Sequence, residues 1–178
     1  MAVGGGPQGN ICYSNDGVQF ILSDVFFGAG IGYAVAYGQG RWIAVGMNTL
    51  GTQSIGYSIN SVNWLPLPNF FENGVGRGVA FDGTGNRWMV IGYGTNGSIG
   101  YSTDAGETWT TSSRIFEGGS GGAAIACNGA QNIWVAVGSS FVNSIAYSSD
   151  GVVFANKVGD FSTGIAPFYM SLIPILRT

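Results

Sequence analysis

A fourfold internal repeat constrains the fold of this chain more than any other feature. Four segments share the pattern Ile-x-Tyr-Ser followed by Asp or Asn, and their tyrosines recur at spacings of 44, 44 and 46 residues. A second family of segments surrounds Trp42, Trp88 and Trp134, and a third, made of small apolar residues, precedes it in each unit. Three families in one fixed order indicate tandem repeats, and units of 40 to 50 residues with this patterning are typical of propeller blades.

Each unit predicts four short strands. In the third unit these are residues 78–81, 87–92 and 98–102, followed by a strand that begins near Thr108. The first strand is a run of small apolar residues, as expected where innermost strands crowd around an axis. No stretch of useful length has a helical period. We therefore predict an all-β protein, a β-propeller of about four blades, each a four-stranded antiparallel sheet.

The predicted blades make one repeat domain, residues 1–178. The blades are expected at about residues 1–26 plus 161–178, 27–70, 71–115 and 116–160. In this scheme the N-terminal residues supply three strands of one blade, and a C-terminal strand within 161–178 completes it, which removes an exposed sheet edge. Two arrangements stay open: a four-bladed ring closed within one chain, and an open set. The open set would be completed by a second chain or would belong to a longer protein.

Composition narrows the range of partners. Apolar residues make up 46% of the chain and charged residues only 8%, with 32 glycines and a net charge of −3. The six basic residues are scattered singly, so the chain is not expected to have a basic patch that would bind nucleic acid or an anionic membrane. No signal peptide or membrane-spanning segment is expected, because the N-terminus lacks a basic and apolar region and the apolar run 168–176 is too short. Virion or surface and cytoplasmic locations both remain compatible.

The cysteines and the absence of histidine bear on cofactors. Cys12 and Cys127 are expected to be buried free thiols, and a bridge requires ring closure to bring the two ends together. The chain has no His, and a zinc site needs more ligands than two cysteines provide. We expect no metal and no cofactor.

One segment carries a family resemblance. Ser102 to Trp109 reads Ser-Thr-Asp-Ala-Gly-Glu-Thr-Trp and matches the Asp-box pattern Ser-x-Asp-x-Gly-x-Thr-Trp. The other three copies are one residue shorter. The repeat resembles those of Asp-box (BNR, sialidase-like) propellers and of photosystem-assembly-factor-like propellers, in which the box is a structural turn. The resemblance therefore implies structural roles for the acids and amide of the turns, which are Asp16, Asn60, Asp104 and Asp150.

Physical chemistry favours the same role for these turns. A short Asp or Asn side chain accepts hydrogen bonds from amides about two residues ahead, the next residue takes a positive φ, and the closing aromatic packs under the turn. Calcium is the alternative ligand for the acids. It needs six or more oxygens close together, and each turn brings one carboxylate. We therefore expect the four turns to have a structural role and not to bind calcium.

The resemblance also raises a sialidase-type glycosidase as an alternative. That activity uses an arginine cluster, a tyrosine nucleophile backed by an acid, and an Asp acid/base. Arg41 and Arg87 occupy equivalent positions ahead of the strand tryptophans, so they are expected to be exposed repeat features. Only Arg77 and Arg114, expected in loops, can share a face with a ligand, and two arginines do not make a triad. We expect no enzyme.

Two non-catalytic functions remain. The first is a structural or interaction protein, for instance of a virion, fibre or surface layer, because a chain with so few charges is expected to bury surface against protein partners or further copies of itself. The second is a lectin-like module for a neutral glycan, and inter-blade packing is the alternative role for its aromatics. An assembly chaperone resembling the photosystem factors fits less well, because that family displays a basic arginine patch and the six basic residues here are scattered. The candidate ligand residues, all expected on one loop face, are Tyr33, Arg77, Tyr93, Arg114 and Phe141.

Overall fold

The computed structural model describes residues 1–6, 9–23, 25–83, 85–112, 115–116, 121–129, 131–140 and 144–157. Over these ranges the chain is all-β, with fifteen strands and no helix. Accordingly, the described part contains no helix of the length and apolarity that crossing a bilayer would take. The strands form one three-stranded and three four-stranded antiparallel sheets, as predicted for a propeller.

The sheets follow one another along the chain, and each is a meander of consecutive strands. The first blade contains β1 (Ala2–Val3), β2 (Ile11–Tyr13) and β3 (Ile21–Leu22). The second contains β4 (Ile31–Gly38), β5 (Arg41–Met47), β6 (Ile55–Ser58) and β7 (Leu65–Pro66). The third contains β8 (Val75–Phe81), β9 (Trp88–Tyr93), β10 (Ile99–Ser102) and β11 (Thr110–Thr111). The fourth contains β12 (Gly121–Asn128), β13 (Ile133–Ser139), β14 (Ile145–Ser148) and β15 (Ala155–Lys157).

The innermost strands are longer than the sequence predicts. β8 begins at Val75, whereas the small apolar run begins at Gly78. The strand continues through this region because a bulge between Gly76 and Gly78 shifts the register against β9 by one residue. β4 and β12 have bulges at the equivalent place. The C-terminal strand expected to complete the first blade lies outside the described residues.

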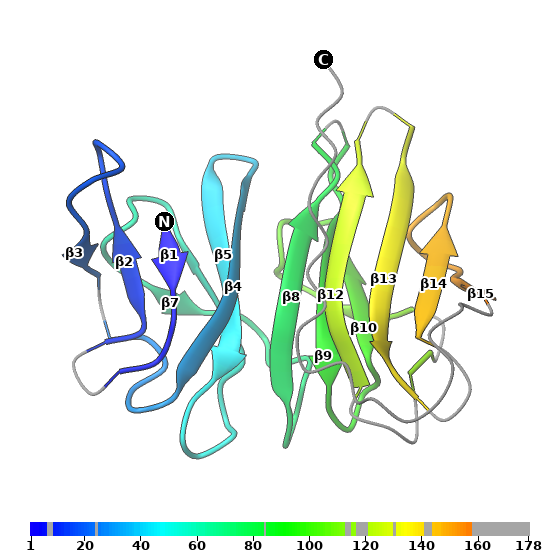
Figure 1. Cartoon of the computed structure of the whole chain (residues 1–178), viewed down its shortest axis with the longest axis horizontal. Coiled ribbons are helices and arrows are strands. Elements are labelled where there is room, and N and C mark those ends of the chain that lie inside the picture. The colour runs from blue at the N-terminus through cyan, green and yellow to red at the C-terminus, as the bar shows by residue number, and fades with distance from the viewer. Residues whose placement is uncertain are drawn as a thin grey trace.

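The four blades stand side by side in an arc. Figure 1 shows the first blade, with β1–β3, at one end of the longest axis and the fourth, with β12–β15, at the other. The inner strands β4, β8 and β12 contact one another in sequence between these ends, and β1 contacts β4. The strand that would close the ring lies outside the described residues, so the closed and the open arrangement both stay predictions.

Apolar cores fill the spaces between successive blades. The core between the first two blades includes Ile11, Phe27, Ala44 and Trp64. The next is built on residues such as Ile43, Ile55 and Trp88, and the third on residues such as Met89, Ile99 and Trp134. The segments joining the blades add aromatic pairs: Phe26 and Phe27 meet edge to face at 4.8 Å, and Phe70 and Phe71 at 5.0 Å. Edge-to-face contact is a favourable geometry for such rings.

Glycines on the third strand of two blades make room for these rings. A Cβ at Gly56 would collide with the ring of Phe26, and one at Gly100 would lie 2.9 Å from the ring of Phe70. The fourth blade has the smaller Ile115 in place of the phenylalanine and Ala146 in place of the glycine, and both belong to its core. The pairs are complementary in size, as close packing requires.

This complementarity predicts a coupled pair of substitutions. Gly100→Ala should lower the free energy of unfolding by about 1–3 kcal/mol, because the methyl group overpacks the Phe70 ring. In a Phe70→Ile background, which reproduces the pair of the fourth blade, Gly100→Ala should be neutral or stabilising. Urea unfolding of the two single variants and the double variant gives the coupling energy, expected to be about 1–2 kcal/mol. Additive effects would contradict the packing argument.

Candidate functional site

The turn before the outermost strand of each blade has the same hydrogen-bonded design. In the third blade, Ser102 Oγ donates to Asp104 Oδ1 at 2.7 Å and accepts from the amide of Gly106 at 2.8 Å. The Asp104 carboxylate also accepts from the amide of Thr108 at 2.9 Å and from its hydroxyl at 2.6 Å. Equivalent bonds surround Asp16, Asn60 and Asp150. Each acid or amide therefore bonds to its own turn.

The residue after each acid or amide adopts a left-handed conformation. Two turns have glycine there, Gly17 at φ 75° and Gly151 at φ 67°. The other two have Ser61 at φ 68° and Ala105 at φ 61°. Side chains other than glycine are strained in this region. The turn bonds are thus strong enough to hold the conformation even without a glycine.

These bonds lower the pKa of the turn acids. The pKa of Asp16 lies below its ordinary value of 3.8, chiefly because the amides of Gln19 and Val18 donate to the carboxylate. The pKa of Asp104 is lowered chiefly by the hydroxyl of Thr108, and that of Asp150 chiefly by the amide of Val152. A carboxylate held ionised by its own turn is a poor general acid.

The aromatics that close the turns of the second, third and fourth blades pack against the preceding blade. Trp64 belongs to the core shared with the first blade, Trp109 packs on the core shared with the second, and Phe154 belongs to the core shared with the third. Trp64 Nε1 donates to Ser23 Oγ of the first blade at 2.8 Å. The sequence places this aromatic under its own turn. In the structure it packs in the core between two blades, and we call this aromatic residue the plug of its turn.

The strand residue opposite the plug varies between blades. Ser23 and Ser112 each donate to a carbonyl of the next blade's turn, at 2.7 Å and 2.6 Å. Leu67 stands at the same register position in the second blade. Among the described residues, Trp109 Nε1 is accordingly buried with no acceptor. The apolar Leu67 replaces the hydroxyl that Trp64 uses.

Arg41 and Arg87 also join successive blades. Arg41 Nη1 donates to the carbonyl of Ala105 at 3.1 Å, lies 3.4 Å from the Glu107 carboxylate, and stacks on Tyr57 at 4.8 Å. Arg87 stacks on Tyr101 at 5.4 Å, and its charge helps to lower the pKa of Asp150 in the next blade. Both are half-buried, not exposed as expected. In the fourth blade, Ile133 occupies this position.

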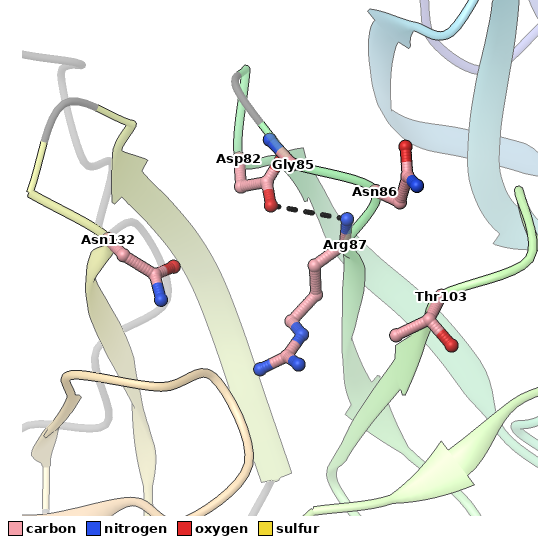
Figure 2. A pocket seen from close by; sticks show the side chains of 6 residues that line it. All are labelled: Asp82, Gly85, Asn86, Arg87, Thr103 and Asn132. Carbon is pink, nitrogen blue, oxygen red and sulfur yellow. Dashed lines mark hydrogen bonds between the residues drawn. The ribbon is translucent and has the colours of Figure 1, made fainter.

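A polar pocket of about 330 Å³ opens beside Arg87, between the turns of the third and fourth blades. Figure 2 shows Asn132 of the fourth blade across from Arg87 and Thr103 of the third. The Asp82 carboxylate is engaged in its own turn, because it accepts from the amides of Gly85 at 2.9 Å and Arg87 at 3.2 Å. The lining provides one cation and a satisfied carboxylate, which is no acid–base pair. Its residues are Asp82, Gly85, Asn86, Arg87, Thr103 and Asn132.

Three of the predicted ligand residues lie in the described part, and Arg114 and Phe141 lie outside it. Tyr33 is the bulged residue of β4 and is 45% exposed. Arg77 is the bulged residue of β8, not a loop residue, and its guanidinium lies 5.2 Å from the centre of the Tyr93 ring. The structure therefore joins Arg77 and Tyr93.

The two cysteines lie in the end blades and are unbridged, with both side chains half-buried. Cys12 is in β2 and Cys127 is in β12. Burial and the nearby Asp82 raise the pKa of Cys127 to about 11. This thiol is protonated at neutral pH and is a poor nucleophile.

Sequence reasoning missed the outer face of the first blade. Phe20 is the closing aromatic of the first turn and is 53% exposed, whereas Trp64 and Phe154 at the same repeat position are 4% and 5% exposed. Val18 is 81% exposed, against 39% for its counterpart Val62. Within the described ranges, no blade receives the aromatic of the first turn. Only the arrangement of blades reveals this, because Phe20 and Phe154 look alike in the sequence.

Comparisons place the fold among propellers. No protein-family model matches the chain, and no curated protein does. Among solved structures, the GH74 enzyme of Niastella koreensis is similar over 71% of this chain, with 20% identity and a TM-score of 0.52. A structure titled YCF48 bound to D1 peptide is similar over 70%, with 16% identity and a TM-score of 0.51. This chain spans 17% and 38% of those chains, and the likeness concerns the fold alone.

The turn acids predict a defined acid sensitivity. Their pKa values are lower in the folded chain than the ordinary 3.8. Their contribution to stability is therefore complete above that value and is lost as the pH falls through the folded pKa. A variant with Asp16→Asn, Asp104→Asn and Asp150→Asn should lose less stability between about pH 5 and about pH 2 than the native chain does. Asn60 already shows that an amide fits the turn.

Urea unfolding across this pH range measures the effect. The control is Asp82→Asn, which removes a carboxylate outside the four turns. Parallel curves for the triple variant and the native chain would refute the link between the turn bonds and acid stability.

Proposed function

We propose that this chain is a non-catalytic β-propeller that serves as a structural or interaction protein, of the kind that builds assemblies, virions or surfaces. The observation that carries the proposal is the exposure of Phe20, 53%, at a repeat position that is buried in the second and fourth blades. Its natural environment is the face of another sheet. A partner protein that covers this face would supply that environment.

The neighbourhood of Phe20 supports a protein partner. Val18, Ile21 and Leu22 are 81%, 54% and 53% exposed, so apolar side chains follow the turn and the outer strand β3. Exposed apolar patches of this kind mark interaction surfaces. With only 8% charged residues the chain also has few groups to keep such a patch solvated. A propeller of similar fold has been solved with a peptide bound, which is compatible with this use of the fold.

The chemistry of the described residues supports a non-catalytic role. The turn acids and Asp82 accept hydrogen bonds from their own turns, and Arg41 and Arg87 hold neighbouring blades together. Covalent catalysis needs an activated nucleophile with an adjacent base. The serine hydroxyls that donate to carboxylates belong to the turns themselves, and burial raises the pKa of the Cys127 thiol to about 11.

A stability comparison tests the role of Phe20. Phe20→Ser should change the free energy of unfolding of the chain by less than about 0.5 kcal/mol, because Phe20 is 53% exposed and belongs to no core cluster of the described residues. Phe154→Ser, the same change at the buried counterpart, should cost about 3–5 kcal/mol. Urea unfolding of both variants gives the two values. An equal cost at both positions would show that Phe20 is part of the core.

Photo-crosslinking then tests the interaction. Benzoylphenylalanine at position 20 should form protein adducts in the natural host of the protein. The same probe at position 50, where Leu50 is 80% exposed in a loop of the second blade, is the matched control. Equal yields at the two positions, or none at position 20, would overturn the proposed function.

Binding of a neutral glycan is the second candidate. Tyr33 and Tyr93 are 45% and 39% exposed, and aromatic faces of this kind stack on sugars. Arg77 covers one face of Tyr93, so that ring offers one face at most. Tyr33→Ala and Tyr93→Ala should each weaken sugar binding roughly 3- to 10-fold if this candidate holds. Calorimetric titration measures this, with Tyr37→Ala as the control at the other end of β4. Absence of binding at millimolar sugar would end this candidate.

A further inference from the structure

Each junction between blades has two complementary sides. One side is the turn of the following blade, whose aromatic plug enters the core, as Trp64 and Phe154 do. The other side is the face of the preceding blade, which receives the plug with the residues of its second and third strands. A serine of the outermost strand, Ser23 or Ser112, bonds to the turn at two of the junctions. The plug side and the receiving side recur at all three junctions.

In the first blade, no described residue covers the plug side. Phe20 is half-exposed, and Val18 beside it is almost fully exposed. The turn itself is built like the others, because Asp16 accepts from the amides of Val18 and Gln19 at 2.8 Å. The first turn is therefore preformed for docking, and its plug needs no rearrangement to enter a core.

The fourth blade presents a receiving side that is only partly covered. Ile145 is half-buried, whereas its counterparts Ile55 and Ile99 are fully buried in the cores of the second and third blades. Val135 is likewise half-buried, whereas its counterparts Ile43 and Met89 are fully buried. In the part of the chain that the structure describes, neither Ile145 nor Val135 belongs to a core cluster.

We propose that the first blade of one copy docks on the fourth blade of a second copy, head to tail, as one blade docks on the next within the chain. In this contact Phe20 enters the space beside Ile145 and Val135 of the second copy. The inference rests on the proposed function and names its partner. Both halves of the contact belong to this sequence, and the contact continues the three junctions already present. The two ends lie at opposite extremes of the arc, so a second copy brings them together (Figure 1).

One residue distinguishes this contact from the internal junctions. Arg41 and Arg87 reach the turn of the following blade, but the fourth blade has Ile133, 40% exposed, at that position. The contact between copies is therefore apolar where two internal junctions are charged. An arginine at position 133 would face the first turn of the second copy, near Asp16.

Sedimentation equilibrium of the full chain over a wide concentration range tests the proposal. The native chain should associate. Phe20→Asp and Ile133→Asp should each weaken association at least 10-fold, because they place a carboxylate in the contact. Leu50→Asp, an equal change at an exposed residue away from both ends, should leave it unchanged. Ile133→Arg should strengthen association roughly 2- to 5-fold, by analogy with the internal arginines. Both changes at position 133 replace a partly exposed side chain, so the fold should tolerate them, and circular dichroism verifies this.

Mixing the two weakened variants tests the head-to-tail geometry. A chain with Phe20→Asp keeps an intact fourth blade, and one with Ile133→Asp keeps an intact first blade. Their equimolar mixture should form a discrete dimer of one chain of each kind, because a heterologous contact has two different sides. No dimer in the mixture, or a native chain that is monomeric at all concentrations, would overturn the proposal. Adducts at position 20 with a different protein would then still support the proposed function, so the two failures are distinguishable.

Discussion

Each blade of this protein is a small sheet with two apolar faces, and it can bury them only against its neighbours. A separate three- or four-stranded sheet of two- to eight-residue strands would expose both faces to water. The cores accordingly lie between blades, and the aromatic plugs of the second, third and fourth blades each pack into the core shared with the blade before it. The order of the blades, the glycines under Phe26 and Phe70, and the arginine contacts all serve this packing. A blade without a neighbour on one side is therefore incomplete.

The polar groups of the turns make the plugs possible. A plug is useful only if its ring leaves the turn in a fixed direction, and a seven- or eight-residue turn is otherwise mobile. The Ser-x-Asp or Ser-x-Asn bonds fix this direction by satisfying the amides that the tight turn would leave without partners. Hydrogen bonds to a carboxylate are stronger than those to an amide oxygen. Three of the four turns use Asp, and the pKa of each of these acids is lowered accordingly. The turn acids thus stabilise the packing between blades indirectly, because they fix the direction in which each plug leaves its turn.

The repeat pattern was sufficient to predict the strands, their antiparallel order and the turns, because each depends on residues close in sequence. It placed Arg77 in a loop because it does not reveal the bulge that extends β8. It also placed the plugs under their own turns, since a single blade does not show which neighbour receives the ring. Arg41 and Arg87 were expected at the surface for the same reason. The exposure of Phe20 was beyond sequence reasoning, because Phe20 and Phe154 have the same local pattern and differ only in what stands beside them.

A repeat unit whose face stays in water normally makes that face polar, since an exposed apolar face would make the isolated chain insoluble. Edge strands are commonly protected in the same way, by charge or by proline. The first blade follows neither rule. Its outer strand β3 consists of Ile21 and Leu22, both exposed, and its plug is a phenylalanine, whereas the equivalent strand of the third blade is Thr110–Thr111. A blade that exposes the apolar residues that other blades bury is built to have a neighbour. The nearest surface of matching design is the partly covered face of the fourth blade, where Ile133 takes the place of the arginine.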